Sequence, residues 1–416
     1  MRTGRRVKID LQSAIVALTG ALDFVGVDEV HHGKRVALIA AAIADELGWD
    51  APAIHDLLYA GMLHDCGVSR HREHRQLTET LEWEGAQEHC LRGEEFLLAC
   101  PPLARFAPAI RWHHTRWEHL PDAPLADPER LVTNLLFLAD RTDVLFVPYL
   151  SGQALHDRIL WEFPQIVGRL GAMAGTLFAP VLVTAFARAA ARESFWLALD
   201  PTYLEAELAD RMRGARPVEL GAGDALAVAR LFARTVDAKS NYTLEHSTRV
   251  ARIARFLGQA SGASGDTLDQ LEIAGLLHDI GKLRVSEEII DKPATLTREE
   301  RAAVTRHSYD TGHILRKVFP GQPIARWAAM HHENLLGSGY PRHIAAAGIP
   351  REARLIAVAD IFQACCQERP YRRRLAAGEV MAELDALSAA GRIDAEMVEL
   401  VRSRLAACYA LAVGAE

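Results

Sequence analysis

The chain has 416 residues, half of them hydrophobic and about a quarter charged, with a formal net charge of −7 at neutral pH. A chain of this length is too long for one ordinary domain and suits two or three, each with its own core. The negative charge argues against a general nucleic-acid binder, because a phosphate backbone requires a basic face. A small anionic ligand in a local basic pocket stays compatible with it.

Cysteines and apolar segments bear on the compartment. The six cysteines form no CxxC pair and show no regular spacing, which fits a reducing compartment and argues against zinc held by thiolates. Gln12 and Ser13 interrupt the apolar run Leu11–Leu22, so we expect an amphipathic first helix there rather than a signal peptide. Since no apolar stretch of about 18 residues occurs, we expect a cytoplasmic protein without a membrane span.

The most informative feature is an internal repeat. Residues 60–67 (AGMLHDCG) recur as residues 274–281 (AGLLHDIG), and at the same offset residues 32–36 (HGKRV) recur as residues 246–250 (HSTRV). Downstream, with a small drift, Arg111-Trp112 and His113-His114 match Arg326-Trp327 and His331-His332, and Ala139-Asp140 matches Ala359-Asp360. Shared offsets over such a distance indicate two homologous domains.

Local sequence patterns predict an almost entirely helical chain. Residues 36–47, 250–257 and 299–318 carry apolar residues at three- and four-residue spacing, whereas strand-like alternation is scarce. Glycine and proline cluster near residues 121–128, 214–223 and 337–341. We therefore expect an all-α fold with a first domain at 1–213, a linker at 214–221 and a second domain at 222–416.

The second repeat contains an ordered set of residues able to bind metal. Apart from the lysine, all are nitrogen or oxygen ligand types at predicted helices: His246, His278, Asp279, Lys282, His307, His331, His332 and Asp360. Imidazole and carboxylate together suit divalent iron or manganese. The two oxygens of Asp279 can serve two ions while His278, about 100° away around the helix, binds one of them. Any single histidine is more often a core or surface residue, but an ordered and duplicated set favours a metal site.

Two motifs in this half resemble a known family. Residues 278–282 (HDIGK), followed by residues 331–341 (HHENLLGSGYP), resemble the HD-GYP phosphodiesterases of bacteria, and residues 360–364 and 369–372 match later blocks. The resemblance covers the whole C-terminal half. It implies an all-α architecture of two tandem HD-type helical bundles, and hydrolysis of cyclic di-GMP or of 3′,3′-cyclic GMP-AMP. Products would be a linear dinucleotide and further mononucleotides.

The resemblance also implies roles for individual residues. His246, His278 and Asp279 would hold one ion; Asp279, His307, His331 and His332 would hold another, with Asp360 completing the set. Asp279 and Lys282 would be catalytic, with Lys282 facing the phosphate. Substrate contacts would come from Gly339, Tyr340, Pro341, Arg369 and Arg372, since arginine suits phosphate or a guanine edge. Two ions would activate water and stabilise the charge that develops at phosphorus.

Three positions depart from the family pattern. Tyr242 stands where some members carry a glutamate that binds a third metal, so we expect two divalent ions, iron or manganese. Leu336 and Gln363 each replace a usual aspartate, without loss of a ligand. Glu333 either orients a ligand histidine or is an ordinary surface residue at a helix end.

The first repeat keeps the corresponding ligand types but not the substrate features. It retains His32, His64, Asp65, His89, His113, His114 and Asp140. Val68 replaces the lysine, and no Gly-Tyr-Pro loop follows His114. We expect a degenerate HD domain with a regulatory or structural role, acting through a homodimer or a signalling-protein partner, and leave open whether it binds metal. His31, His71, His74 and His119 are expected at the surface.

Two other functions compete with a cyclic-dinucleotide phosphodiesterase. One is a receptor or interaction module that binds the dinucleotide without turnover, and the other is an HD phosphohydrolase acting on another nucleotide. A complete ligand set favours an enzyme over a receptor, because binding alone does not require every ligand. The GSGYP block at residues 337–341 argues against the other phosphohydrolase.

Overall fold

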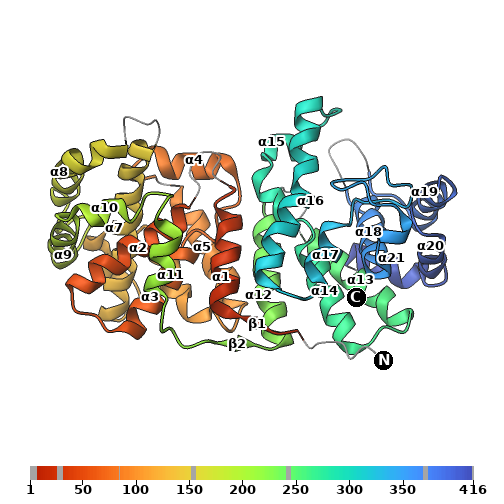
Figure 1. Ribbon diagram of the computed structural model, residues 1–416, viewed down its shortest axis with the longest axis horizontal. Coiled ribbons are helices and arrows are strands. Elements are labelled where there is room, and N and C mark those ends of the chain that lie inside the picture. Colours follow the sequence, from red (N-terminus) through yellow and green to blue (C-terminus); the bar gives the residue numbers. More distant parts are fainter. Residues whose placement is uncertain are drawn as a thin grey trace. The chain divides into compact units, whose positions relative to one another are not determined.

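The structure is a computed structural model that describes residues 7–25, 31–83, 85–150, 156–239, 245–368 and 373–414. The chain forms two compact units (Figure 1). One, the N-terminal unit, comprises residues 22–218; the other, the C-terminal unit, combines residues 1–21 with residues 219–416. From the sequence, residues 1–21 are expected in the first domain, whereas in the structure strand β1 (Ile9–Asp10) pairs antiparallel with β2 (Glu219–Leu220). The domain boundaries at 213 and 222 themselves remain a prediction.

Helices build both units. The N-terminal unit contains α2 (His32–Glu46), α3 (Ala51–Leu63), α4 (His71–Glu79), α5 (Ala86–Leu98), α6 (Ala107–Trp112), α7 (Asp127–Phe146), α8 (Ile159–Gly171), α9 (Pro180–Ala190), α10 (Glu193–Leu197) and α11 (Leu204–Arg211). The C-terminal unit contains α12 (Ala222–Asp237), α13 (His246–Ala260), α14 (Gly265–Leu277), α15 (Glu287–Ile290), α16 (Arg298–Val318), α17 (Ile324–Ala329), α18 (Arg351–Cys365), α19 (Ala377–Ala389), α20 (Ala395–Arg402) and α21 (Leu405–Val413). Helix α1 (Leu11–Leu22) follows β1, and the 3-10 helix η5 (Ile280–Arg284) follows α14.

The expected helices are confirmed, and side-chain caps explain several of their ends. Asp50 accepts a hydrogen bond from the amide of Ala53 at the start of α3, and Ser264 caps α14 in the same way. Helix α16 begins with a capping box between Thr297 and Glu300. Such caps satisfy amides that have no partner within the helix. The all-α fold is therefore confirmed, with β1 and β2 as its short strands in the described residues.

The same two close helix contacts occur in both units. A Cβ atom on Gly61 would lie 2.7 Å from the Cα atom of Ala37, and one on Gly275 would lie 2.8 Å from that of Ala251. These glycines let α3 pack on α2 and α14 pack on α13. After the His-Asp pair, a Cβ on Gly67 or Gly281 would lie 2.1 Å from the carbonyl oxygen of His89 or His307. The sequence repeat is thus also a repeat of packing.

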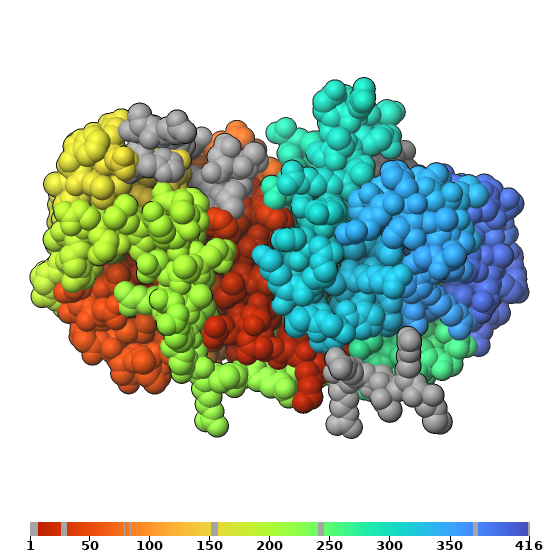
Figure 2. All heavy atoms as spheres, viewed as in Figure 1, coloured from red at the N-terminus to blue at the C-terminus, as the bar shows by residue number. Residues whose placement is uncertain are grey.

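The surface and the thiols agree with a helical globular protein. Among the described helices, none is both long and apolar enough to cross a bilayer. All six cysteines are free and buried. Figure 2 shows the atoms of α19 and α20 (dark blue) along one outer edge of the C-terminal unit. The metal-binding residue types lie instead on α13, α14, α16, α17 and α18 or directly after them.

The contact at Gly281 predicts a large effect of one methyl group. We expect Gly281→Ala to destabilise the C-terminal unit by about 1–3 kcal/mol, because the added carbon overlaps the His307 carbonyl and forces the backbone to move. Urea unfolding followed by circular dichroism measures the change. Gly378→Ala is the control: nothing lies within 4 Å of its added carbon, and we expect slight stabilisation of about 0.4–1 kcal/mol. Equal midpoints for the two variants would contradict the packing argument.

Candidate metal centre

Helix ends and helix interiors bring the predicted ligands of the C-terminal unit together. His246 is the first residue of α13, and His278-Asp279 directly follow α14. His307 lies within α16 and Asp360 within α18. His331 and His332 come just after α17. All seven side chains lie within one buried cluster, although their roles as ligands remain a proposal.

The carboxylate of Asp279 is the centre of this cluster. Its Oδ1 atom lies 3.3 Å from His307 Nε2 and 3.6 Å from His331 Nε2. Its Oδ2 atom lies 3.2 Å from His278 Nε2 and 3.8 Å from His246 Nε2. Each oxygen therefore faces a different pair of imidazoles, which is the arrangement expected of a carboxylate that bridges two cations.

Hydrogen bonds on the far side of the rings fix which nitrogen faces the cluster. His278 Nδ1 donates to the carbonyl of Gly275 at 2.7 Å, and His331 Nδ1 donates to that of Ala328 at 2.6 Å. His307 Nδ1 donates to the Val304 carbonyl in the same way. Because a carbonyl only accepts, the proton of each neutral ring is on Nδ1 and the Nε2 lone pair faces inward.

The spacing of these lone pairs fits a metal ion. His307 Nε2 and His331 Nε2 are 3.2 Å apart, and two lone pairs at this distance repel each other. Two nitrogens bound tetrahedrally to one ion at about 2.0–2.1 Å lie roughly 3.3 Å apart. The residues present therefore fit a divalent cation between the two rings.

The electrostatics of the cluster also favour a cation. Burial alone would raise the pKa of Asp279, but His278 and Lys282 hold that pKa well below its usual value. Burial likewise opposes charge on His278, yet the carboxylates of Asp279 and Asp360 raise its pKa to about 9. Burial lowers the pKa of His331, and burial together with His307 lowers that of His332 to about 3. The cluster thus combines ionised carboxylates with neutral rings at His331 and His332, whereas His278 would release its extra proton to bind a metal ion.

The structure places Asp360 on one side of Asp279. Three groups of side chains have ligand atoms within 4.8 Å of one another: His246 with His278 and Asp360, His278 with Asp279 and His331, and His307 with His331 and His332. Asp360 Oδ1 is 3.3 Å from His246 Nε2. Asp360 therefore lies with His246 and His278, whereas His332 lies with His307 and His331.

Lys282 and Tyr340 border the cluster. Lys282 Nζ donates to Asp279 Oδ2 at 2.6 Å and keeps 29% of its side chain exposed. The ring of Tyr340 lies 4.7 Å from that of His332, centroid to centroid. Gly339 allows this approach, since a Cβ there would lie 2.4 Å from the His332 carbonyl oxygen. Gly339 and Pro341 therefore shape the loop that holds Tyr340 beside the cluster.

Glu333 supports this loop, a role that neither sequence alternative describes. Its carboxylate accepts hydrogen bonds from the backbone amides of Arg342 at 2.7 Å and Ile344 at 3.0 Å. It is buried and not at the surface. The neighbouring Asn334 accepts from the amides of Leu336 and Ser338. Two side chains that follow the ligand histidines thus fix the backbone of the Gly-Ser-Gly-Tyr-Pro loop.

Other sequence-predicted positions have different outcomes. Arg369, Arg372 and Tyr242 lie outside the described residues. Gln363 is fully buried in α18, and among the described residues neither its amide atoms nor His246 Nδ1 has a hydrogen-bond partner.

Asp237 was not predicted from the sequence as part of the site. Its carboxylate accepts hydrogen bonds from the backbone amide and the hydroxyl of Ser247 and so supports the start of α13. Asp23 and Asp237 are separated by the same offset as the repeated motifs. This shared offset was the feature of the sequence that could have identified Asp237.

The N-terminal unit also brings its seven expected residues together, with one correction to the repeat. His113 and His331 both donate from Nδ1 to the carbonyl three residues earlier, so Arg111-Trp112 is not equivalent to Arg326-Trp327. His119 is exposed as expected. His74 is half-buried, and its ring centroid lies 6.4 Å from that of His32, because α4 places it toward the cluster.

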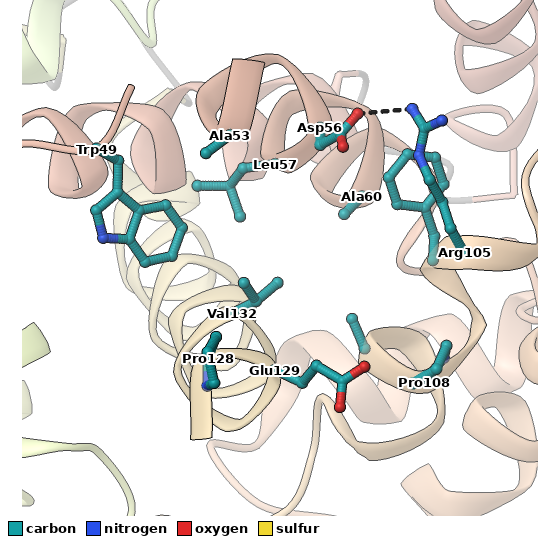
Figure 3. Close-up of a pocket in the computed structure, with 12 residues that line it drawn as sticks. Trp49, Ala53, Asp56, Leu57, Ala60, Arg105, Pro108, Pro128, Glu129 and Val132 are labelled. Carbon is teal, nitrogen blue, oxygen red and sulfur yellow. Dashed lines mark hydrogen bonds and ion pairs between the residues drawn. The ribbon is translucent and has the colours of Figure 1, made fainter. Parts of the chain in front are cut away.

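A mostly apolar cavity of about 360 Å³ lies in the N-terminal unit, and its lining does not include the histidines and aspartates of the cluster around Asp65 (Figure 3). Trp49, Leu57 and Val132 line it, and Asp56 pairs with Arg105 at 2.6 Å on its rim. The side chain of Asp56 is exposed. None of the expected ligands lines this cavity.

The role of Glu333 predicts a local effect on the loop. The Glu333→Gln side chain keeps one oxygen that can accept a hydrogen bond from Arg342 or Ile344. Its NH2 group faces the other backbone N–H, which then has no acceptor. We expect amide exchange at Arg342 and Ile344 to accelerate about tenfold or more, since an unsatisfied buried donor costs about 1–3 kcal/mol. Hydrogen–deuterium exchange with mass spectrometry measures this, and the exposed Glu383→Gln is the control. Unchanged exchange in Glu333→Gln would refute the supporting role.

Comparisons with known proteins agree with this geometry. Residues 230–397 and residues 30–145 each match the HD domain family. The chain is 35% identical over 408 residues to 3′3′-cGAMP-specific phosphodiesterase 1 of Vibrio cholerae, covering 97% of this chain and 94% of that protein. It is 34% identical over 146 residues to a cyclic di-GMP phosphodiesterase response regulator of Xanthomonas campestris, covering 34% of this chain and 38% of that protein.

A solved structure is similar to this chain over most of its length. The crystal structure of a cyclic GMP-AMP-specific phosphodiesterase of V. cholerae superimposes with a TM-score of 0.63 at 25% identity, covering 97% of this chain and 98% of that one. The similarity therefore extends over both HD domains. The chain belongs to the HD-GYP family of cyclic-dinucleotide phosphodiesterases and carries two HD domains in tandem.

Proposed function

We propose that the C-terminal unit hydrolyses 3′,3′-cyclic GMP-AMP at the cluster around Asp279. The observation that carries the proposal is the Asp279 carboxylate, whose two oxygens face two separate pairs of imidazoles. This arrangement suits a pair of divalent cations, which is the equipment for phosphodiester hydrolysis at neutral pH. Lys282, in contact with the same carboxylate, supplies a positive charge at the exposed side of the cluster.

The extent of similarity favours the mixed dinucleotide over cyclic di-GMP. Two relatives named for 3′3′-cGAMP match 97% and 90% of this chain and a third matches 41%, whereas the cyclic di-GMP relative from Xanthomonas campestris matches 34%. A substrate preference set by residues outside the shared catalytic core would follow the longer match. Within the catalytic core, Leu336 and Gln363, where the sequence departs from the family, are separate candidates for an effect on substrate choice.

The residues of the chain have separable tasks in this reaction. His246, His278 and Asp360 would hold one ion; His307, His331 and His332 would hold the other; Asp279 would contribute to both. When bound, the two ions supply Lewis acidity for water activation and for neutralising charge at phosphorus. Lys282 places its ammonium where it can stabilise a phosphoryl oxygen or protonate a leaving 3′-oxygen. Tyr340 offers a ring face and a hydroxyl beside the same cluster.

Several finer expectations belong to this proposal. The ions would be iron or manganese, because the ligands mix imidazole with carboxylate. Arg369 and Arg372 would contact the dinucleotide. The N-terminal unit would act as a structural or regulatory domain, through a homodimer or a signalling-protein partner, in a cytoplasmic enzyme.

The first test compares two substrates and one ligand variant. Wild-type protein loaded with ferrous or manganous ion is expected to cleave 3′,3′-cyclic GMP-AMP with higher kcat/KM than cyclic di-GMP. Asp279→Asn is expected to lose at least about 10³-fold in kcat/KM, because the ions contribute several kcal/mol. Equal turnover by both proteins would defeat the catalytic assignment. Tight binding without cleavage would point to a receptor, and cleavage only of other nucleotides to a different phosphohydrolase.

A second variant isolates Lys282. We expect Lys282→Gln to lower kcat about 10²-fold, as removal of one preorganised charge does in other active sites, while the bound metal content stays at the wild-type level. Lys317→Gln, at an exposed position of α16, is the control and should retain full activity. Loss of metal in Lys282→Gln would show that the lysine serves ligand placement instead of the reaction.

A further inference from the structure

The N-terminal unit repeats the geometry of the Asp279 cluster around Asp65. Asp65 Oδ1 lies 3.3 Å from His89 Nε2 and 3.8 Å from His113 Nε2. Asp65 Oδ2 lies 3.5 Å from His64 Nε2 and 3.7 Å from His32 Nε2. Its two oxygens thus face two pairs of imidazoles, as those of Asp279 do.

One part of this cluster converges more fully than its C-terminal counterpart. Asp65, His89, His113 and His114 offer four ligand atoms that all lie within 4.8 Å of one another, whereas the groups in the C-terminal unit have three members each. His89 Nε2 and His113 Nε2 are 3.3 Å apart. This separation equals the roughly 3.3 Å expected for two nitrogens on one tetrahedral ion.

Hydrogen bonds behind the rings hold this cluster in a ligand-ready form. His113 Nδ1 donates to the Ile110 carbonyl and His64 Nδ1 to the Gly61 carbonyl, both at 2.7 Å, so the Nε2 lone pairs face Asp65. Among the described residues, His64 Nε2 is a buried nitrogen without a hydrogen-bond partner. His89 Nε2 lies 3.7 Å from the Sγ atom of Cys90, and a thiol is a weak hydrogen-bond partner that a metal ion can replace.

His32 has a hydrogen-bond partner behind its ring that His246, its counterpart in the C-terminal unit, lacks among the described residues. His32 Nδ1 donates to Asp143 at 2.7 Å, and Arg35 Nε donates to the other oxygen of the same carboxylate at 2.6 Å. A carboxylate behind a histidine fixes its ring and strengthens it as a ligand. By the repeat, Gln363 occupies the place of Asp143 in the C-terminal unit.

We propose that the N-terminal unit binds a first-row divalent metal ion of its own, held by Asp65, His89, His113 and His114. Three imidazoles and one carboxylate suit zinc or ferrous iron. With 18% of the Asp65 side chain exposed and the two rings His89 and His113 fully buried, the ion has an entry path at the carboxylate. This site is separate from the cluster around Asp279 and does not depend on the proposed substrate.

The surroundings of this site give the ion a structural role. Val68, which is buried, takes the place of Lys282. After His114 the amides of Trp117 and Glu118 bond to the carbonyls of Leu177 and Thr176, and Leu120, Ala123 and Leu125 form a small hydrophobic cluster with Trp112 and Trp117. The segment that corresponds to the substrate loop is therefore packed against the domain.

Arg141 is a second difference between the N-terminal cluster and the cluster around Asp279. Its Nε and Nη2 atoms donate to Asp140 Oδ2 at 3.1 and 2.7 Å, and both side chains are buried. The guanidinium neutralises the carboxylate that, in the C-terminal unit, lies beside His246 and His278. The group His32, His64 and Asp140 is thereby weakened as a cation site, which leaves the four-residue group around His89 as the metal position.

Matched variants of the two bridging carboxylates test the proposal. Metal content of the intact chain is measured by mass spectrometry after chelation, reloading with Zn²⁺ alone and desalting, for wild type, Asp65→Asn, Asp279→Asn and the double variant. We expect Asp65→Asn to lose about one ion per chain relative to wild type, and Asp279→Asn to retain that ion until Asp65 is also changed. His119→Gln, at an exposed histidine of the same unit, should keep the wild-type content. An Asp65→Asn protein with unchanged metal content would overturn the proposal.

A measurement on the unaltered chain covers the case in which Asp65→Asn does not fold. Crystals of the Zn²⁺-loaded wild-type protein are measured above and below the zinc absorption edge. We expect an anomalous peak between Asp65, His89, His113 and His114, in addition to signal at the C-terminal cluster. Anomalous signal confined to the C-terminal cluster would overturn the proposal.

Discussion

A buried carboxylate surrounded by imidazoles is the interaction on which both units depend. A carboxylate transferred from water to a protein interior is strongly destabilised unless positive charge compensates for it. At Asp279 the neighbouring His278 and Lys282 already keep its pKa far below the usual value. The helices that surround this residue carry the imidazoles whose lone pairs face its two oxygens. The fold therefore concentrates potential ligand atoms at one point, where a bound cation would add further positive charge.

Backbone packing is what allows these ligands to meet. Gly275 brings α14 against α13, and Gly281 brings the turn after the His-Asp pair against the carbonyl of His307. A methyl group at either place would separate helices that carry different ligands. The same contacts at Gly61 and Gly67 recur in the N-terminal unit, so the cluster geometry is a property of the repeated packing and not of one catalytic domain.

The two units share a cluster of imidazoles and carboxylates but differ in the residues around it. Both retain the histidines and the central aspartate. Among the described residues, a lysine contacts that aspartate in the C-terminal unit alone, where Glu333 and Asn334 also fix the loop that carries Tyr340. In the N-terminal unit Val68, Arg141 and the packed segment after His114 replace these features. The repeat has thus kept the geometry of the cluster while the residues around it diverged.

The sequence by itself determined the helical fold, the repeat and the identity of the converging residues. Ligand types at helix ends and a shared offset are local or pairwise signals, and packing then brought all seven C-terminal residues together.

The tertiary structure decided the remaining points. It assigned residues 1–21 to the C-terminal unit through pairing with β2, placed Asp360 beside His246, and gave Glu333 two backbone amides as partners. It also showed that the matched Arg-Trp pairs are not equivalent, because hydrogen bonds to the carbonyl three residues earlier set the register of His113 and His331. Such contacts join residues far apart in the chain or depend on backbone geometry, neither of which a residue type reveals.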